Sequence, residues 1–328
     1  NISGKGIDLM NHEMIKHSKK KLPCIGKKMI QCIKSYRNND ILLFGGIGIN
    51  NECYNECYRY NVKRNKYYQL KALDRKIFGD LNHCMYHNKV VLTPYNKYLL
   101  GSYKIGKGLS YVIYDENKDT WTSFNYSNPN KLNITEKYVN YAFDDFNTLH
   151  IINKYGHFYI DWDTKIVHQL NTNIPNEIIQ FYQIEMNGLR EPSILINVNR
   201  NLCWFNKNSM YFYDISNNQW YKSSNDDNIG SSLICYNAMV INRNIICVGN
   251  EIISDFPTDV MCIYNIETNK WTTKNNIFGN RYSQIGCCFV NNEIHTFGGY
   301  YNIGNTKTVK VINNHFVFKT INAIIIDN

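Results

Sequence analysis

The sequence predicts an all-β protein: a closed ring of six units, each a four-stranded antiparallel sheet. Two observations lead to this fold class. A pair of aromatic residues recurs at one fixed separation and at intervals of about 50 residues, a repeat length typical of such sheet units. In addition, a Gly-Gly doublet follows an apolar strand-like stretch near both ends of the chain. The composition agrees, because 26 Tyr and only 6 Pro residues favour strands.

The recurring pair is a tyrosine followed directly by Asn or Asp and, after a polar stretch, by a second aromatic residue. An Asn or Asp placed directly after a strand starts a turn, and the second aromatic residue opens the returning strand. Each pair therefore predicts a β-hairpin whose rings pack against a neighbouring sheet. The pairs are Tyr60 with Tyr67, Tyr114 with Trp121, Tyr213 with Trp220 and Tyr264 with Trp271. Two degenerate copies, near 159–170 and 309–321, complete the six.

Upstream of each hairpin, two apolar strand-like stretches flank a turn, and the second ends at the position of the glycine doublet. Glycine there gives the strand a tight exit without a side chain. The doublet is intact at Gly45-Gly46 and Gly298-Gly299, keeps one glycine in units two and five, and is lost in units three and four. This order of strand, doublet, tyrosine and tryptophan resembles the kelch repeat over nearly the whole chain. The resemblance implies a kelch-type six-bladed β-propeller.

We expect a basic N-terminal arm over residues 1–28, followed by the propeller. The arm holds the densest lysine cluster, Lys19–Lys21 with Lys27 and Lys28, and is interpreted as a solvated, mobile segment. Because the first residue is not Met, the arm could be the remnant of a longer chain. The stretch AIII (323–326) is expected to help close the ring. The expected blades are approximately 29–78, 79–130, 131–185, 186–228, 229–279 and 280–328.

Composition and charge disfavour several classes of protein. No apolar run approaches the roughly 18 residues that a membrane helix needs, and residues 1–28 contain no secretory signal. The net charge of +9 is modest for 328 residues, so no nucleic acid is expected as a partner. The 11 cysteines form no CxxC motif and mostly lie in apolar stretches, which indicates reduced thiols. We therefore expect a cytoplasmic, monomeric propeller.

Three stretches approach motifs of catalytic or metal sites. GSYKIGKG (101–108) lacks the Ser or Thr of a P-loop and leads into a strand. His83 and His87, if they lie on a strand, are about 13 Å apart and cannot share one metal ion. Cys53 and Cys57 have no visible second pair of ligands. No catalytic residue, cofactor or metal is predicted, and we expect no enzyme. The resemblance leaves one alternative open, a kelch-like copper oxidase of the galactose-oxidase type.

The resemblance implies a protein-interaction module or scaffold, since many kelch propellers are adaptors that recruit a client protein. The loops between the second and third strands are expected to share a face with the connections between blades, and recognition residues commonly lie on such loops. Two of these loops combine tyrosine with lysine, which suits an acidic protein or peptide. The candidate partner-binding residues are Tyr103, Lys104, Lys107, Tyr300, Tyr301 and Lys307.

Overall fold

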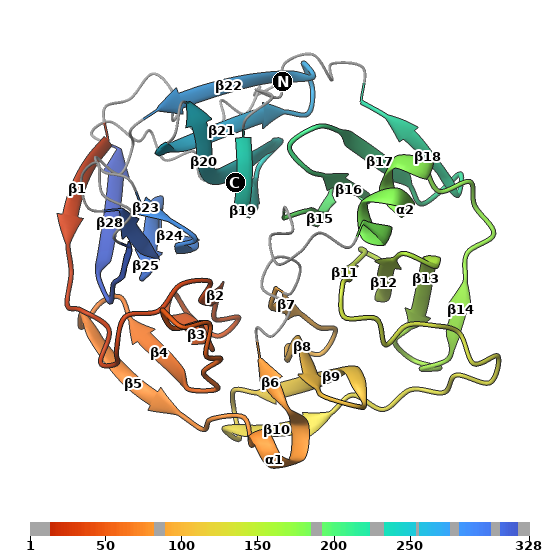
Figure 1. The fold of residues 1–328 in the computed structure, drawn as a ribbon, viewed down its shortest axis with the longest axis horizontal. Helices are drawn as coiled ribbons and strands as arrows, with labels where there is room; N and C mark the ends of the chain where they lie inside the picture. Colours follow the sequence, from red (N-terminus) through yellow and green to blue (C-terminus); the bar gives the residue numbers. More distant parts are fainter. Residues whose placement is uncertain are drawn as a thin grey trace.

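The computed structural model describes residues 14–81, 89–184, 192–223, 233–253, 256–275, 282–302 and 309–320. Six antiparallel sheets stand around a central axis, and Figure 1 shows them in a view down that axis. The strands of each sheet are ordered from the axis outward, so each sheet is one blade of a propeller. The predicted fold class, a six-bladed β-propeller of four-stranded antiparallel blades, is confirmed.

Four blades consist of four consecutive strands that run from the innermost to the outermost position. They are blade one with β2 (Gln31–Lys34), β3 (Ile41–Phe44), β4 (Cys57–Asn61) and β5 (Lys66–Leu70); blade three with β11 (Asn140–Phe143), β12 (Thr148–Asn153), β13 (Gly156–Asp161) and β14 (Val167–Gln169); blade four with β15 (Ile194–Val198), β16 (Asn201–Phe205), β17 (Met210–Asp214) and β18 (Gln219–Lys222); and blade five with β19 (Leu233–Ile241), β20 (Asn244–Ile253), β21 (Phe256–Asn265) and β22 (Lys270–Asn275).

Blade two differs at its innermost position, which is divided between two short strands that both pair with the next strand outward. Its strands are β6 (Asp80–Leu81), β7 (Val91–Leu92), β8 (Tyr98–Lys104), β9 (Gly108–Asp115) and β10 (Thr120–Ser123). The connection from blade one carries a short helix, α1 (Arg75–Phe78), and the connection from blade three to blade four carries α2 (Asn176–Gln183).

The sixth blade is completed by the N-terminal part of the chain. Its strands, from the inside outward, are β24 (Gly286–Val290), β25 (Glu293–Phe297), β28 (His315–Thr320) and β1 (Met14–Ser18). β1 runs antiparallel to β28, with Met14 opposite Thr320 at one end of the ladder. The interpretation of residues 1–28 as a solvated arm is therefore wrong for β1. An outermost strand faces solvent along its free edge, so a polar, lysine-containing sequence is tolerated there.

The hairpin expected over residues 309–321 is replaced by a different arrangement. β27 (Val309–Val311) pairs with β26 (Tyr300–Asn302), and β26 pairs with β23 (Tyr282–Ser283), so the three form a small separate sheet. β28 lies instead between β25 and β1. Residues 323–326, the segment expected to help close the ring, lie outside the described residues. The described structure closes the ring by pairing β1 with β28, whereas the sequence suggested residues 323–326 for this role.

The third and fourth strands of blades one, two, four and five form the hairpins that carry the aromatic pairs. In blade one, Tyr60 lies directly opposite Tyr67, with the ring centres 4.9 Å apart. Asn61 starts the turn by accepting a hydrogen bond from the amide of Arg64 at 2.7 Å. The Tyr60 hydroxyl donates to Oδ1 of Asn65 at 2.8 Å, and Asn65 has a positive φ of 48°. Strand, turn and returning aromatic residue are thus one hydrogen-bonded unit.

The same unit recurs in three further blades. The hydroxyl of the first aromatic residue donates to a turn residue of positive φ: Tyr114 to Asp119 at 2.8 Å, Tyr213 to Asn218 at 2.6 Å and Tyr264 to Asn269 at 2.7 Å. In blade three, Ile160 and Val167 occupy the paired positions. The turn survives there because Asp161 still accepts hydrogen bonds from the amides of Asp163 and Thr164, both at 3.0 Å.

The glycine doublets lie where the second strands of blades one and six end. Gly298 and Gly299 have φ values of 62° and 102°, a region that other residues rarely adopt. A Cβ atom on Gly298 would lie 2.2 Å from the carbonyl oxygen of Lys27. The missing side chain therefore lets the end of β25 approach the segment that leads into blade one.

In the described residues, the apolar core is divided into six clusters, each between two neighbouring blades. Between blades four and five, Phe205 packs in one cluster with Tyr264. Between blades six and one, Phe297 packs with Tyr60, and this cluster joins the two ends of the ring. α2 contributes Tyr182 to the cluster between blades three and four. Each blade is therefore stabilised by burial against both neighbours, and no cluster spans the axis.

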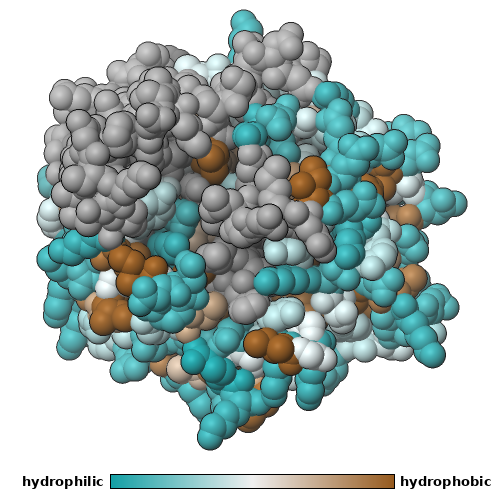
Figure 2. All heavy atoms as spheres, in the orientation of Figure 1, coloured by the Kyte–Doolittle hydropathy of each residue, from teal (hydrophilic) through white to brown (hydrophobic). Residues whose placement is uncertain are grey.

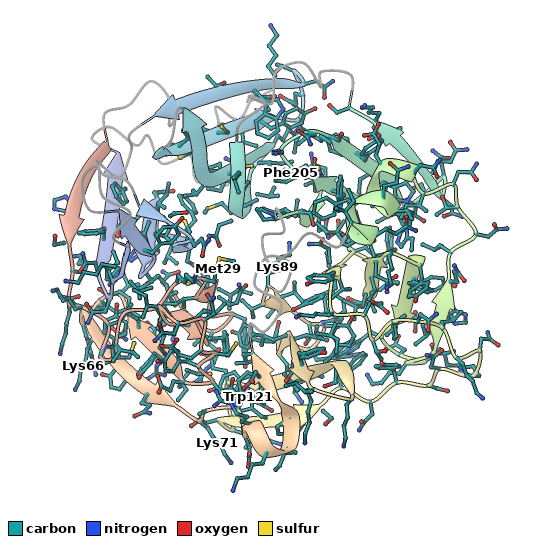
Figure 3. The ribbon with its side chains drawn as sticks, viewed as in Figure 1. Met29, Lys66, Lys71, Lys89, Trp121 and Phe205 are labelled. Carbon is teal, nitrogen blue, oxygen red and sulfur yellow. The ribbon has the colours of Figure 1, made fainter. Side chains whose placement is uncertain are left out.

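The six innermost strands surround a cavity of about 450 Å³ at the propeller axis. Figure 3 shows Met29 and Lys89 close to this axis, whereas Lys66 and Lys71 lie toward the rim. Each innermost strand has one edge that faces the cavity, so backbone groups as well as side chains line it.

Blade three holds a buried chain of polar side chains that ends in blade four. Trp220 Nε1 donates to Nδ1 of His157 at 3.3 Å, and the other ring nitrogen of His157 lies 2.8 Å from Nδ1 of His150. His150 Nε2 lies 2.8 Å from Oδ2 of Asp144. An indole only donates and a carboxylate only accepts, so every bond is satisfied when both imidazoles are neutral. Burial and the neighbouring His150 hold the pKa of His157 well below its ordinary value.

An equivalent chain joins blade six to blade one. The Tyr67 hydroxyl lies 2.9 Å from Nδ1 of His315, and His315 Nε2 lies 3.0 Å from Nδ1 of His295. His295 Nε2 lies 3.2 Å from the Glu293 carboxylate. Burial, and then the neighbouring His295 and Lys19, lower the pKa of His315 to about 2. Two blades thus carry buried histidine pairs in the same order, with an aromatic side chain at one end and a carboxylate at the other.

An ion pair with a buried lysine fixes the segment that enters blade one. The Lys27 side chain is 1% exposed, and its Nζ lies 2.7 Å from Oε2 of Glu56 and 4.8 Å from the ring centre of Tyr54. The backbone of Lys27 donates to Ile312 at 3.1 Å and accepts from Gly299 at 2.7 Å. The lysine therefore ties together the β3–β4 loop, the chain before β2 and the end of blade six.

Replacing Glu56 with Gln should destabilise the protein by about 2–3 kcal/mol, because it leaves a buried ammonium without its counter-charge. We expect the lower part of that range, since the Glu56 side chain is 40% exposed and solvent screens the pair. Chemical unfolding measures the change. The double variant Lys27→Met with Glu56→Gln should recover most of the loss, and a double variant less stable than Glu56→Gln alone would contradict the argument.

The cysteines of the described residues are free thiols. Burial raises the pKa of Cys57 and of Cys288 to about 12, so both thiols stay protonated and unreactive near neutral pH.

Neither described helix is long and apolar enough to cross a membrane.

Candidate functional site

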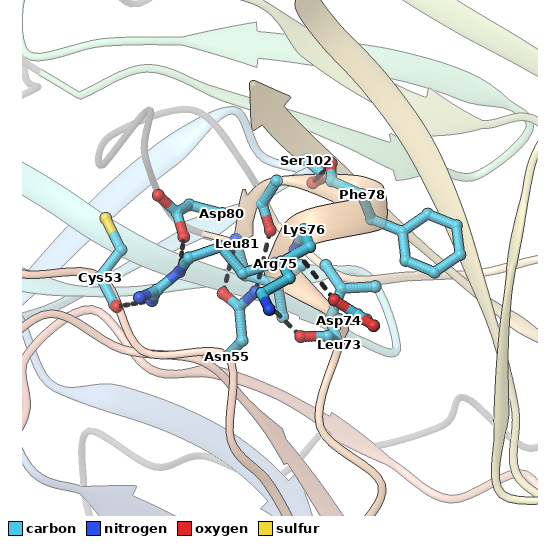
Figure 4. Close-up of polar contacts among 11 residues, drawn as sticks. Cys53, Asn55, Leu73, Asp74, Arg75, Lys76, Phe78, Asp80, Leu81 and Ser102 are labelled. Atoms are coloured by element: carbon cyan, nitrogen blue, oxygen red, sulfur yellow. Dashed lines mark hydrogen bonds and ion pairs between the residues drawn. The ribbon is translucent and has the colours of Figure 1, made fainter. Parts of the chain in front are cut away.

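One face of the propeller combines the β3–β4 and β8–β9 loops with the connection between blades one and two; we call it the loop face. The side chain of Asn55, in the β3–β4 loop, joins that loop to the connection by hydrogen bonds. Its Nδ2 donates to the carbonyl oxygens of Leu73 at 3.1 Å and Gly79 at 2.9 Å, and its Oδ1 accepts from the amide of Leu81 at 3.0 Å (Figure 4). The loop of one blade therefore positions the connection to the next, as the sequence predicts.

The helix α1 is fixed on this face at both of its ends. Asp74 caps its N-terminus by accepting from the amide of Lys76 at 2.9 Å. At its C-terminus, the Ser102 hydroxyl donates to the carbonyl of Phe78 at 2.6 Å. Gly79 follows with a φ of 93°, and a Cβ atom there would lie 2.4 Å from the backbone oxygen of Tyr103. The connection is thus held close against β8.

Two isoleucine side chains on this face point into solvent. Ile77 on α1 is 65% exposed, and Ile105 in the β8–β9 turn is 85% exposed. Their segments are joined, because Lys104 Nζ donates to the backbone oxygen of Lys76 at 2.6 Å. Figure 2 shows that apolar side chains on the face it draws form small patches among hydrophilic ones. Two such side chains on linked segments give this face apolar area that no described residue covers.

The side chains around these isoleucines are basic and aromatic. Lys137 Nζ lies 5.5 Å from the ring centre of Tyr103 and 5.6 Å from that of Tyr138. Among the described residues, no acid forms an ion pair with the lysines of this region, and Asp80 is already paired with Arg75. We call this group the blade-two patch: Lys76, Ile77, Tyr103, Lys104, Ile105, Lys107 and Lys137.

The candidate residues from the sequence fall into two separate groups. Tyr103 and Lys104 end β8 and Lys107 lies in the following turn, so these three belong to the blade-two patch. Tyr300 and Tyr301 lie on β26, beside blade six, and Lys28 Nζ is 5.9 Å from the Tyr300 ring centre. Blade one stands between the two groups (Figure 1). Lys307 and the side chain of Tyr301 lie outside the described part of the chain.

Sequence reasoning missed the two isoleucines and two of the lysines of the patch. Ile105 could have been noticed, because an Ile in the turn Lys104–Lys107 has no strand neighbour to cover it. The sequence contains no signal for Lys76, Ile77 or Lys137. They lie on α1 and in the connection between blades two and three, and these segments have no counterpart in the other repeats.

The stretches that approach catalytic motifs take structural roles where they are described. Residues 101–108 form the end of β8, a turn and the start of β9, without a helix that could receive a phosphate. Burial raises the pKa of Cys53 to about 11, so this thiol is also protonated at neutral pH. In the described part of the chain, no three His, Cys, Asp or Glu side chains converge on a possible metal position. His83 and His87 lie outside it.

No family model matches the chain, and no curated protein is significantly similar to it in sequence. The solved structure of YjhT is similar in fold, with a TM-score of 0.56 at 9% sequence identity. The similarity covers 92% of this chain and 97% of YjhT, so it extends over the whole ring. At that identity the likeness concerns the fold alone. In fold, the chain is a kelch-like six-bladed β-propeller.

Proposed function

We propose that this propeller is a protein-interaction module that binds an acidic segment of a partner protein on the blade-two patch. It acts by recruiting that partner, and it needs no cofactor or catalytic residue to do so. One observation carries the proposal: Ile77 and Ile105 are largely exposed, at 65% and 85%, beside lysines that have no acidic partner among the described residues.

The physical properties of the patch suit this kind of partner. Isoleucine and tyrosine supply apolar contact area in the middle of the patch, and burying them on binding provides the main favourable free energy. The surrounding ammonium groups attract carboxylates and orient the approaching segment. Because α1 and the β8–β9 turn are fixed by Asp74, Ser102 and Gly79, little conformational entropy is lost when the patch is covered.

Charge reversal by Lys104→Glu with Lys107→Glu should slow association with the partner about tenfold at low salt, because steering by charge acts mainly on the association rate. Ile105→Asp should instead speed dissociation about tenfold or more, since it removes buried apolar area. Affinity capture with quantitative mass spectrometry identifies proteins that the wild-type chain retains, and surface plasmon resonance at several salt concentrations then measures both rates.

A matched control reverses two exposed lysines at the opposite face, Lys63→Glu with Lys118→Glu, in the β4–β5 and β9–β10 turns. This variant should retain the same partners as the wild type. Partners that survive both patch variants, or that are lost only with the control, would refute the assignment of the site. Melting temperatures of all variants should stay within a few degrees of the wild type, which separates lost binding from lost folding.

A further inference from the structure

The cavity on the propeller axis has the size and wall of a small-molecule site. Its volume of about 450 Å³ falls within the range of about 300–1,000 Å³ that is usual for such sites. Apolar residues from all six blades line it, among them Leu92, Phe143, Ile196 and Met239. A mainly apolar wall with a few polar groups favours a ligand with an apolar body and one polar end.

Lys89 is one of two lysines in the wall of this cavity, and it extends across it. It lies just before β7, and its Nζ donates to the backbone oxygen of Leu195 on β15, so the side chain reaches from blade two to the innermost strand of blade four. Figure 3 places Lys89 near the axis, away from the rim. An ammonium has three donors, and the Leu195 carbonyl takes one of them.

The described wall of the cavity offers this lysine no counter-charge. Among the described residues that line the cavity there are two lysines, Lys34 and Lys89, and neither Asp nor Glu. Burial lowers the pKa of Lys89 to about 8, the direction expected for an ammonium that lacks a counter-charge. Lys34 is different: it is exposed at the end of β2, and its Nζ donates to the neighbouring Ser35 carbonyl at 3.3 Å.

Nearby polar side chains are already engaged with one another. Oδ1 of Asn140 accepts from the Ser193 hydroxyl at 2.6 Å, and Nδ2 of Asn140 donates to the Ser193 backbone oxygen at 3.2 Å. Asn197 donates to the Phe143 carbonyl at 3.0 Å. The Lys89 ammonium is therefore the group most available to a ligand. One cation in an apolar surrounding suits a single negative charge better than a doubly charged, strongly hydrated phosphate.

We propose that the axial cavity binds a small organic monocarboxylate, whose carboxylate pairs with Lys89 and whose apolar body packs against Leu92, Phe143 and Met239. Binding gives Lys89 a counter-charge that the described wall of the cavity does not provide. This site is independent of the loop face, and each can be occupied without the other.

Isothermal titration of the full chain with benzoate and hexanoate tests the proposal, with benzamide and hexanamide as uncharged probes of nearly the same shape. We expect saturable binding of the acids, at least tenfold tighter than that of the matching amides. Lys89→Met should abolish the preference for the acids, and Lys89→Gln provides a second variant should the methionine disturb folding. Lys34→Met is the matched control, and it should bind benzoate as the wild type does.

Three outcomes would overturn the proposal: equal affinity for acid and amide, undiminished benzoate binding by both Lys89 variants, or no saturable binding at millimolar concentrations of any probe. The comparison of acid with amide uses the wild-type protein alone, so it decides the question even where a variant unfolds. If Lys89 serves only to connect blades two and four through its hydrogen bond to Leu195, its replacement changes the melting temperature and leaves the preference for acids intact.

Discussion

Removing residues 1–18 should destabilise the propeller by about 5 kcal/mol, because the deletion takes β1 away from blade six. Roughly five backbone hydrogen bonds of the ladder are lost, each worth about 1 kcal/mol net. The loss also leaves β28 as an unpaired outer strand, an open edge that favours aggregation. A domain is commonly stable by only about 5–15 kcal/mol, so the shortened chain should be near the limit of folding.

Chemical unfolding of two truncated chains measures this effect. A chain that begins at residue 14 keeps β1, and the difference between it and the chain that begins at residue 19 isolates the contribution of the strand. A synthetic peptide of residues 14–18 should restore stability to the shorter chain, because it can occupy the vacated position beside β28. If the two truncated chains unfold at the same denaturant concentration, β1 does not stabilise the ring.

Lowering the pH from 7 to 5 should reduce the free energy of unfolding by about 4 kcal/mol, through the buried histidines His157 and His315. Both have pKa values lowered in the folded protein, His315 to about 2. An unfolded histidine titrates near 6.5, so below that pH the unfolded chain binds protons that the folded chain refuses. Stability is therefore fully present above pH 6.5 and falls by about 1.4 kcal/mol per pH unit for each histidine as the pH decreases.

The side-chain hydrogen-bond partners of His157 and His315 are the neighbouring members of the two histidine chains described above. A proton added to His157 Nδ1 would set a donor against the Trp220 indole, and one added to His315 would place a positive charge in a buried site beside His295. The carboxylates of Asp144 and Glu293 lie beyond them, at the far ends of the two chains, next to the outer imidazoles. The nearby Lys19 opposes protonation of His315 further.

Urea unfolding at pH 7, 6 and 5 gives the slope of stability against pH. His157→Gln and His315→Gln should each remove about half of the slope, because an amide can donate and accept in the same chain without titrating. His168→Gln is the control, since His168 stacks on Tyr159 at the outer strands and belongs to neither chain. A slope that persists in the double Gln variant would assign the acid sensitivity to other groups.

The features that the sequence predicted well are those with short-range causes. Tyr60 and Tyr67 can be found because the turn between them is stabilised by its own residues, Asn61 and Asn65, and the same local pattern recurs in other blades. Copies that lost the aromatic residues, as Ile160 and Val167 show, could be placed only by their distance from the others.

What could not be predicted depends on contacts between distant segments. β1 is a short polar stretch whose strand structure comes from β28 at the other end of the chain, so no local pattern identifies it. The blade-two patch arises because Asn55 and Ser102 hold α1 in place from two different blades. Lys89 looks like any surface lysine in the sequence, and only the ring places it on the axis.

The pairing of β1 with β28 also sets an order of events during protein synthesis. At about 5–20 residues per second, a ribosome needs roughly 15–60 seconds to make the roughly 300 residues that separate the two strands. Throughout that time β1 exists without its partner. Blades one to five can form while the chain is still growing, but the ring becomes a single cooperative unit only after β28 has left the ribosome. An mRNA truncated within the last blade would therefore yield an open arc with two exposed ends, a species that chaperones and proteases recognise.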